Sequence, residues 1–214
     1  MKYKLIIFDM DGTILNTLDD LSDCTNYALS QSGLPTRTID EIRSFVGNGI
    51  ARLIARSVPE GTDDEMRDKV YGIFTEYYKE HCADKTRPYD GITELIMRLR
   101  ELGYKTAVVS NKADFAVQDL CVQYFDGLFD MAVGAKDGVA KKPAPDSVYE
   151  VLDKLGFEKK DAVYIGDSDV DIATADNSGL DSIIVEWGFR DREFLIEHGA
   201  KVLVKKPEEI LDLI

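Results

Sequence analysis

The sequence predicts an α/β protein with a doubly wound, Rossmann-like parallel sheet and an all-helical domain inserted into it. Two observations support this fold class. Short apolar runs alternate with amphipathic helical patterns, and one long stretch near the N-terminus has helical patterns only. Apolar runs without polar alternation are typical of strands buried on both faces of a parallel sheet. The expected strands are 5–8, 106–109, 162–165 and 182–185, with shorter candidates at 131–133 and 202–204.

Helices are expected between these strands. Over 92–102, apolar residues recur at the spacing of one helix face, and Gly103 follows as a stop signal. The same spacing returns over 148–155, where Pro145 suits the start of a helix and Gly156 its end. The alternation of strands and helices therefore continues through the second half of the chain.

The stretch that follows the first strand has a different character. It contains no convincing strand, and the helices expected in it are 17–31, 38–45, 48–58 and about 62–80. We therefore expect a core domain of residues 1–15 and 84–214, with a helical cap domain of residues 16–83 inserted between its two parts.

Composition limits the partners that the protein is expected to have. The chain has 214 residues and a formal net charge of −14, so a nucleic acid is not expected to bind it. A small anionic substrate remains possible, because a local cation can dominate a pocket. The three cysteines lack metal-ligand spacing, and no apolar run approaches the length of a membrane span. We expect a cytoplasmic monomer or homodimer with no membrane partner.

Polar side chains stand where three of the four strong strands end. They are Asp9 and Asp11, then Ser110 and Asn111, then Asp167. Ligands of open α/β sheets bind outside the carboxyl ends of the strands, so these residues are expected to meet at one edge.

Asp9 and Asp11 are two positions apart, which in extended backbone would point both carboxylates the same way. Carboxylates that close repel each other unless a cation is present, and Asp167 adds a third negative charge. Three oxygen ligands without histidine or cysteine favour Mg²⁺ over zinc. The alternative is that Asp9–Gly12 is only a solvated turn, which the buried strand before it makes less plausible.

Four short motifs occur in a fixed order along the chain. They are Asp9-Met10-Asp11-Gly12-Thr13, Ser110-Asn111, Lys142-Pro143 and Gly166-Asp167-Ser168-Asp169-Val170-Asp171. This ordered set resembles the haloacid dehalogenase-like hydrolases over most of the chain, including a helical cap after the first motif. Within that family the chain looks most like the phosphoglycolate phosphatase branch.

The resemblance implies a role for each matching residue. Asp9 would attack phosphorus and form an aspartyl-phosphate, and Asp11 would act as general acid and base. The presence of this second aspartate favours phosphoryl transfer over dehalogenation. Lys142 would contact the phosphoryl group and Asp9. Mg²⁺ would be held by Asp9, by the backbone carbonyl of Asp11 and by Asp167.

Further residues are expected to bind substrate or to support the site. Ser110, Asn111 and the Gly12 N–H would bind phosphoryl oxygens. Asp171 would orient the lysine and the water around the metal, and Thr13 would either assist or only fix its loop. Asn48, between two glycines at the start of a cap helix, would touch the far end of the substrate, although an ordinary turn explains it nearly as well.

The function expected from these residues is Mg²⁺-dependent hydrolysis of a small phosphorylated metabolite, with 2-phosphoglycolate the leading candidate. A phosphomutase similar to β-phosphoglucomutase, or a pyrophosphatase, would use the same chemistry with a different acceptor. A non-catalytic binding module on this fold is a second alternative, which the intact set of Asp9, Asp11, Lys142 and Asp167 disfavours.

Overall fold

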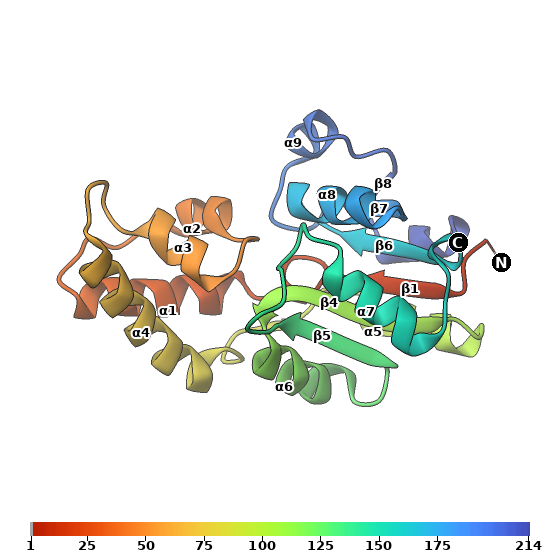
Figure 1. The fold of residues 1–214 in the computed structure, drawn as a ribbon, viewed down its shortest axis with the longest axis horizontal. Helices are drawn as coiled ribbons and strands as arrows, with labels where there is room; N and C mark the ends of the chain where they lie inside the picture. Colours follow the sequence, from red (N-terminus) through yellow and green to blue (C-terminus); the bar gives the residue numbers. More distant parts are fainter. Residues whose placement is uncertain (1) are drawn as a thin grey trace. The chain divides into compact units, whose positions relative to one another are not determined.

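The computed structural model describes residues 2–214, which form two compact units (Figure 1). The first unit comprises the residues up to Leu15 together with Pro88–Ile214, and the second comprises Asn16–Arg87. The second unit thus begins at the expected residue 16 and ends at residue 87, four residues later than the boundary expected from the sequence. The chain passes between the units through two short strands that pair with each other, β2 (Leu15–Asn16) and β3 (Arg87–Pro88).

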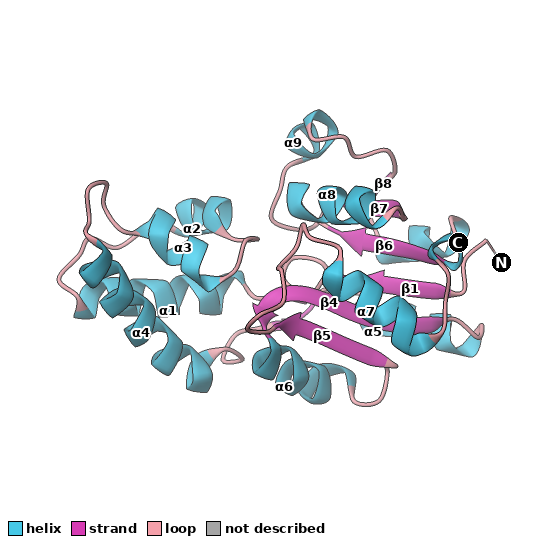
Figure 2. Ribbon diagram, in the orientation of Figure 1, coloured by secondary structure: helices cyan, strands magenta, loops and turns pink. Residues whose placement is uncertain are grey.

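The first unit is built on a parallel sheet, as Figure 2 shows, and this confirms the predicted fold class. Within residues 2–214 the sheet has six strands in the order β5-β4-β1-β6-β7-β8, and every neighbouring pair is parallel. The strands are β1 (Leu5–Phe8), β4 (Lys105–Ala113), β5 (Met131–Ala135), β6 (Ala162–Gly166), β7 (Asp181–Val185) and β8 (Leu203–Val204).

The chain order explains why both faces of this sheet are covered. The connections first run outward from β1 to β4 and β5, then return to β6 on the other side of β1. Because such crossovers are right-handed, the return moves the helices to the opposite face. The helices of this unit are α5 (Ile92–Glu101), α6 (Asp114–Phe125), α7 (Asp146–Leu155), α8 (Asp169–Ser178) and α9 (Arg192–Glu197).

The core lies between the sheet and these helices. All four residues of β1 are fully buried. Leu5 and Ile7 pack in one apolar cluster with Val148 and Val151 of α7, whose spacing of three positions puts them on one helix face. The place where the chain reverses, between β1 and β6, is the usual ligand-binding crevice of doubly wound sheets.

The second unit is helical throughout its interior. Its helices are α1 (Leu18–Gln31), α2 (Ile39–Phe45), α3 (Ile50–Ser57) and α4 (Asp64–His81). Helix α4 buries Val70, Phe74 and Tyr78, which recur every fourth residue and so lie on one face. Thr38 caps α2 in a capping box with Glu41. No helix within residues 2–214 is both long and apolar enough to cross a membrane.

Candidate active site

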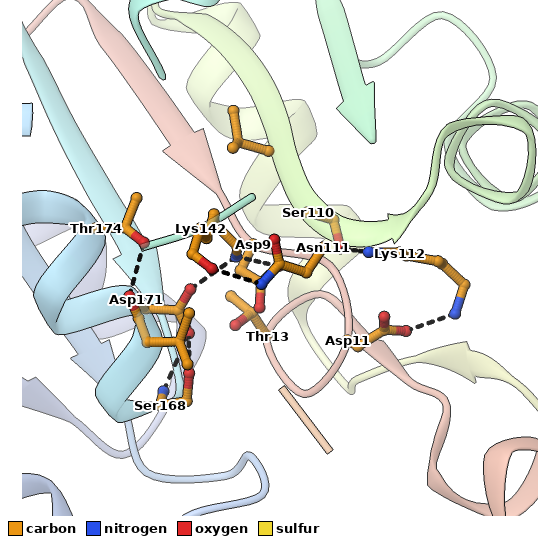
Figure 3. Close-up of polar contacts among 12 residues, drawn as sticks. Asp9, Asp11, Thr13, Ser110, Asn111, Lys112, Lys142, Ser168, Asp171 and Thr174 are labelled. Atoms are coloured by element: carbon orange, nitrogen blue, oxygen red, sulfur yellow. Dashed lines mark hydrogen bonds and ion pairs between the residues drawn. The ribbon is translucent and has the colours of Figure 1, made fainter. Parts of the chain in front are cut away.

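The candidate active site lies at the carboxyl ends of the three central strands, β4, β1 and β6 (Figure 3). Asp9 directly follows β1, Asp167 directly follows β6, and Ser110 belongs to the last part of β4. The parallel register aligns Phe8 with both Val108 and Ile165, so the next residues of all three strands emerge at the same edge. Sheet geometry thus gathers polar residues that are far apart in the sequence.

Lys142 is the central cation of this cluster. Its Nζ lies 2.8 Å from Asp9 Oδ1 and 2.9 Å from Asp171 Oδ1, and it donates a 2.9 Å hydrogen bond to the phenolic oxygen of Tyr164. Only 3% of the Lys142 side chain is exposed. Burial alone would lower the pKa of this lysine, but the charges of Asp171 and Asp9 outweigh burial and hold it well above its usual value. The ammonium group therefore stays charged.

Asp171 is held by the start of α8. Its Oδ2 accepts hydrogen bonds from the Asp167 N–H, the Ser168 N–H and the Ser168 hydroxyl, at 3.2, 3.1 and 2.6 Å. Ser168 and Asp171 form a capping box at the first turn of the helix. A side chain at Gly166 would overlap the Asp171 carboxylate, which explains the glycine there. With both oxygens engaged, Asp171 is suited to orient Lys142.

The carboxyl groups of Asp9 and Asp167 both have raised pKa values. Burial and the nearby Asp171 raise the pKa of Asp9 to about 7, although Lys142 opposes this shift. Burial, Asp171 and Asp9 raise the pKa of Asp167 well above its usual range. Asp167 Oδ2 accepts a 2.7 Å hydrogen bond from the Phe189 N–H. Lys142 pairs with Asp9 and Asp171. Arg190 only partly offsets the effect of burial on Asp167, so the three carboxylates outnumber the cations near them.

This imbalance fits a divalent metal ion. Asp9, Asp167 and Asp171 each offer a carboxylate oxygen within 4.8 Å of the others, and all three residues are buried. Among the described residues, Asp9 Oδ1 has no hydrogen-bond donor beyond its ion pair with Lys142. Oxygen-only ligands suit Mg²⁺. Asp171 accepts three hydrogen bonds on Oδ2 and pairs with Lys142 through Oδ1, whereas each oxygen of Asp167 accepts a single hydrogen bond within residues 2–214. Asp9 and Asp167 are therefore the carboxylates with the most capacity left to hold the ion.

Asp11 does not join this group of carboxylates. Figure 3 shows its side chain directed toward Lys112, whose Nζ lies 2.9 Å from Asp11 Oδ1. The expectation that Asp9 and Asp11 point the same way is therefore wrong. The chain turns at Met10, whose carbonyl accepts hydrogen bonds from the N–H groups of residues 13–15, so the backbone is not extended here. Lys112 was not predicted as a site residue, although it directly follows the motif Ser110-Asn111.

The other residues expected from the first motif lie against Asp167. The Thr13 hydroxyl donates a 3.3 Å hydrogen bond to Asp167 Oδ1. Gly12 has a φ of +88°, and a side chain there would overlap the Asp167 carboxylate. The indole N–H of Trp187 donates to the Thr13 carbonyl at 3.0 Å. Trp187 therefore helps to hold this loop through its indole N–H.

Ser110 and Asn111 are buried next to Lys142 and Lys112. The Asn111 side-chain amide donates a 3.0 Å hydrogen bond to the Lys142 carbonyl, and the Ser110 hydroxyl accepts one of 3.2 Å from the Lys112 N–H. Tyr164 was also missed, because a buried tyrosine in a strand looks like an ordinary core residue. Asn48 belongs to the helical unit, in the turn between α2 and α3, and its contact with substrate stays a prediction.

Comparison with known proteins gives a consistent result. Residues 6–185 match the family model of haloacid dehalogenase-like hydrolases. The chain is 34% identical over 197 residues to a phosphoglycolate phosphatase of Haemophilus influenzae, covering 88% of each chain. It is 29% identical to an N-acetylmuramic acid 6-phosphate phosphatase of Pseudomonas aeruginosa, covering 100% of this chain and 96% of that one.

A crystal structure from Lactobacillus delbrueckii subsp. bulgaricus, described as a "putative phosphoglycolate phosphatase", has the same fold. It shares 42% sequence identity with this chain and superposes with a TM-score of 0.94, covering 100% of this chain and 99% of the other.

Proposed function

Because this chain belongs to the haloacid dehalogenase-like hydrolases, in their phosphoglycolate phosphatase-like branch, we propose that it hydrolyses 2-phosphoglycolate through an aspartyl-phosphate on Asp9. One observation carries this proposal. Asp9 is a buried carboxylate at a strand end, 2.8 Å from the ammonium of Lys142 and next to Asp167. Phosphoryl transfer to a side chain uses a carboxylate nucleophile, a fixed cation and a second carboxylate that can hold a metal ion.

In the first step, a carboxylate oxygen of Asp9 bonds to phosphorus while the bond from phosphorus to the ester oxygen breaks. Asp11, which takes up a proton from water when it leaves its ion pair with Lys112, donates that proton to the departing oxygen. In the second step, water attacks phosphorus, the bond to Asp9 breaks, and Asp11 accepts the proton of the water. The chain is thus returned to its starting state, with inorganic phosphate and glycolate released.

Positive charge and hydrogen-bond donors would stabilise the transferring group. The Lys142 ammonium also contacts Asp171 and Tyr164, which hold it beside Asp9. Its charge is therefore already in position when the phosphoryl group is transferred. Ser110, Asn111 and the Gly12 N–H would bind phosphoryl oxygens. Mg²⁺, held by Asp9, Asp167 and the backbone carbonyl of Asp11, would neutralise charge on the phosphoryl group.

We assign the helical unit, Asn16–Arg87, the role of a cap that limits substrate size and excludes water. Two short strands, β2 and β3, are the only passages of the described chain between this unit and the core, which is a suitable arrangement for hinged movement. Asn48, in the turn just before α3, would contact the end of the substrate away from phosphorus.

A substrate panel tests the proposal. It should contain 2-phosphoglycolate, sugar 6-phosphates, β-glucose 1-phosphate and pyrophosphate, each assayed with Mg²⁺ for release of inorganic phosphate. We expect the highest kcat/KM with 2-phosphoglycolate. Sugar-phosphate isomerisation without phosphate release would show a mutase instead. Failure to turn over any ester would favour a non-catalytic module.

A matched pair of variants links the activity to the site. Asp9→Asn should lose turnover while keeping its folded spectrum, because an amide is a poor nucleophile. Asp137→Asn makes the same chemical change at an exposed aspartate and should keep turnover. Activity of Asp9→Asn close to that of Asp137→Asn would remove Asp9 from its role.

A further inference from the structure

Lys112 and Asp11 form a second, separate ion pair beside the proposed phosphoryl-transfer residues. We propose that Lys112 binds the carboxylate of the substrate, which takes the place of Asp11 on this lysine and so releases Asp11 to the ester oxygen. This inference rests on the proposed function, because it takes Asp11 as the acid–base group. It makes Lys112 a specificity residue for monoesters that carry a second anion near phosphorus.

The burial of the pair is the first support. Only 2% of the Lys112 side chain and 16% of the Asp11 side chain are exposed. A buried ammonium that gives up its carboxylate partner loses much of what offsets its desolvation, so a replacement anion is favoured at Lys112. Asp11 must nevertheless leave Lys112 to reach a leaving oxygen. An anion that takes the place of Asp11 is therefore favoured on the lysine at that moment, and a carboxylate of the substrate supplies the same charge as the one that leaves.

The local backbone is the second support. The pairing register of β4 with β5 shifts between Val109 and Ala113, and Lys112 lies within this irregular segment. Such irregularities redirect side chains next to active sites. Here the segment supplies both Ser110, which is proposed to bind the phosphoryl group, and Lys112, whose N–H donates to the Ser110 hydroxyl at 3.2 Å. A phosphoryl-binding hydroxyl and a buried cation thus come from one short piece of chain.

The dimensions of the substrate are the third support. In 2-phosphoglycolate a single methylene group separates the carboxylate from the ester oxygen. When the ester oxygen is within hydrogen-bond distance of Asp11, the carboxylate therefore lies in the space around Asp11 that Lys112 already reaches. A neutral alcohol portion in the same position offers no anion and leaves Asp11 paired with the lysine.

The test compares 2-phosphoglycolate with 2-hydroxyethyl phosphate, an ester of similar length whose alcohol portion is uncharged, in wild type and Lys112→Met. A charge-assisted contact predicts that wild type prefers the carboxylate by about 10- to 100-fold in kcat/KM. In Lys112→Met this ratio should fall toward 1, mainly through a higher KM for 2-phosphoglycolate. Lys112→Arg, which keeps the charge, should retain part of the preference.

Lys105→Met is the matched control. Lys105 lies on the same strand and pairs with Asp130 at 2.6 Å, but it is half exposed and outside the site. The kcat/KM ratio of Lys105→Met for 2-phosphoglycolate over 2-hydroxyethyl phosphate should equal that of wild type.

An unchanged ratio in Lys112→Met, which means equal losses with both esters, would overturn the inference while leaving the proposed function intact. If Lys112→Met does not fold, equal kcat/KM for the two esters in wild type overturns it. Absence of turnover in wild type would instead overturn the proposed function.

Discussion

Lys142 donates a hydrogen bond of 2.9 Å to the phenolic oxygen of Tyr164, and Tyr164 in turn donates one of 3.2 Å to the Val109 carbonyl. Tyr164 belongs to β6 and is fully buried in the apolar cluster that packs against α7, so its oxygen is a fixed acceptor. With Asp9 and Asp171, it gives the three N–H bonds of the ammonium one acceptor each. The position of the Lys142 ammonium is therefore fixed by a core residue, Tyr164, as well as by the site carboxylates Asp9 and Asp171.

Tyr164→Phe removes this single oxygen and keeps the packing of the ring. The change leaves one N–H of Lys142 and the Val109 carbonyl without these partners, which should cost about 1–3 kcal/mol of stability. Because Lys142 is then less well fixed, kcat should fall by about 10- to 100-fold, the range seen when supporting hydrogen bonds of a site are removed. Tyr149→Phe is the control, since its hydroxyl also contacts a lysine, Lys159, but at the surface. Equal activities of the two variants would contradict a positioning role for Tyr164.

Gly188→Ala should weaken metal binding. A methyl group at this position would overlap the Asp167 carboxylate, which must then move from its place beside Asp9. We expect a higher Mg²⁺ concentration for half-maximal activity and a smaller rise of Tm on adding Mg²⁺. Gly72→Ala, where a methyl group would meet nothing within 4 Å, should leave Mg²⁺ dependence unchanged and stabilise α4 by about 0.5–1 kcal/mol. Identical Mg²⁺ curves for the two variants would show that Asp167 is not a ligand.

Asp20→Ala should destabilise the helical unit. The buried Asp20 carboxylate accepts hydrogen bonds from the backbone N–H groups of Lys85 and Thr86, at 2.8–3.1 Å, and so ties the returning chain to α1. Loss of this acceptor should reduce the free energy of unfolding by about 2–4 kcal/mol in urea titrations. Asp23→Ala breaks only an exposed ion pair with Lys85 and should cost less than about 1 kcal/mol. Similar losses of unfolding free energy in Asp20→Ala and Asp23→Ala would show that the Asp20 carboxylate does not hold the returning chain against α1.

The metal-free protein should lose stability as the pH rises. Burial, followed by repulsion from Asp171, raises the pKa of Asp9 from its ordinary 3.8 to about 7 in the folded state. The folded protein then binds the proton more tightly than the unfolded chain does. This contribution to stability is fully present below about 3.8 and is lost as the pH passes through about 7.

The measurement is the Tm in EDTA between pH 4 and pH 8. Wild type should lose stability relative to Asp9→Asn over this range, because the amide does not titrate. Saturating Mg²⁺ should reduce the difference, since a cation compensates the ionised carboxylate. Parallel curves for wild type and Asp9→Asn in EDTA would show that burial does not disfavour the charged form of Asp9.

Much of the fold could be predicted from the sequence, because buried parallel strands leave a simple pattern of apolar runs. The same pattern located Asp9 and Asp167 at one edge of the sheet, since parallel strands end together. Lys112 could not be found in this way. Its pairing with Asp11 depends on the turn at Met10 and on the register shift in β4, and neither is visible as a periodicity. Tyr164 was hidden for another reason, since its ring satisfies the core pattern and only its oxygen serves the site.

Covalent transfer to Asp9 is the central claim, and it is tested most directly by rapid acid quench during turnover of 2-phosphoglycolate with Mg²⁺. Peptide mass spectrometry of the quenched protein should find the phosphoryl group on the peptide that contains Asp9, and hydroxylamine should remove it, as expected for an acyl phosphate. Rapid turnover with no phosphoryl group on the chain at any quench time, or with the group on another residue, would contradict the account.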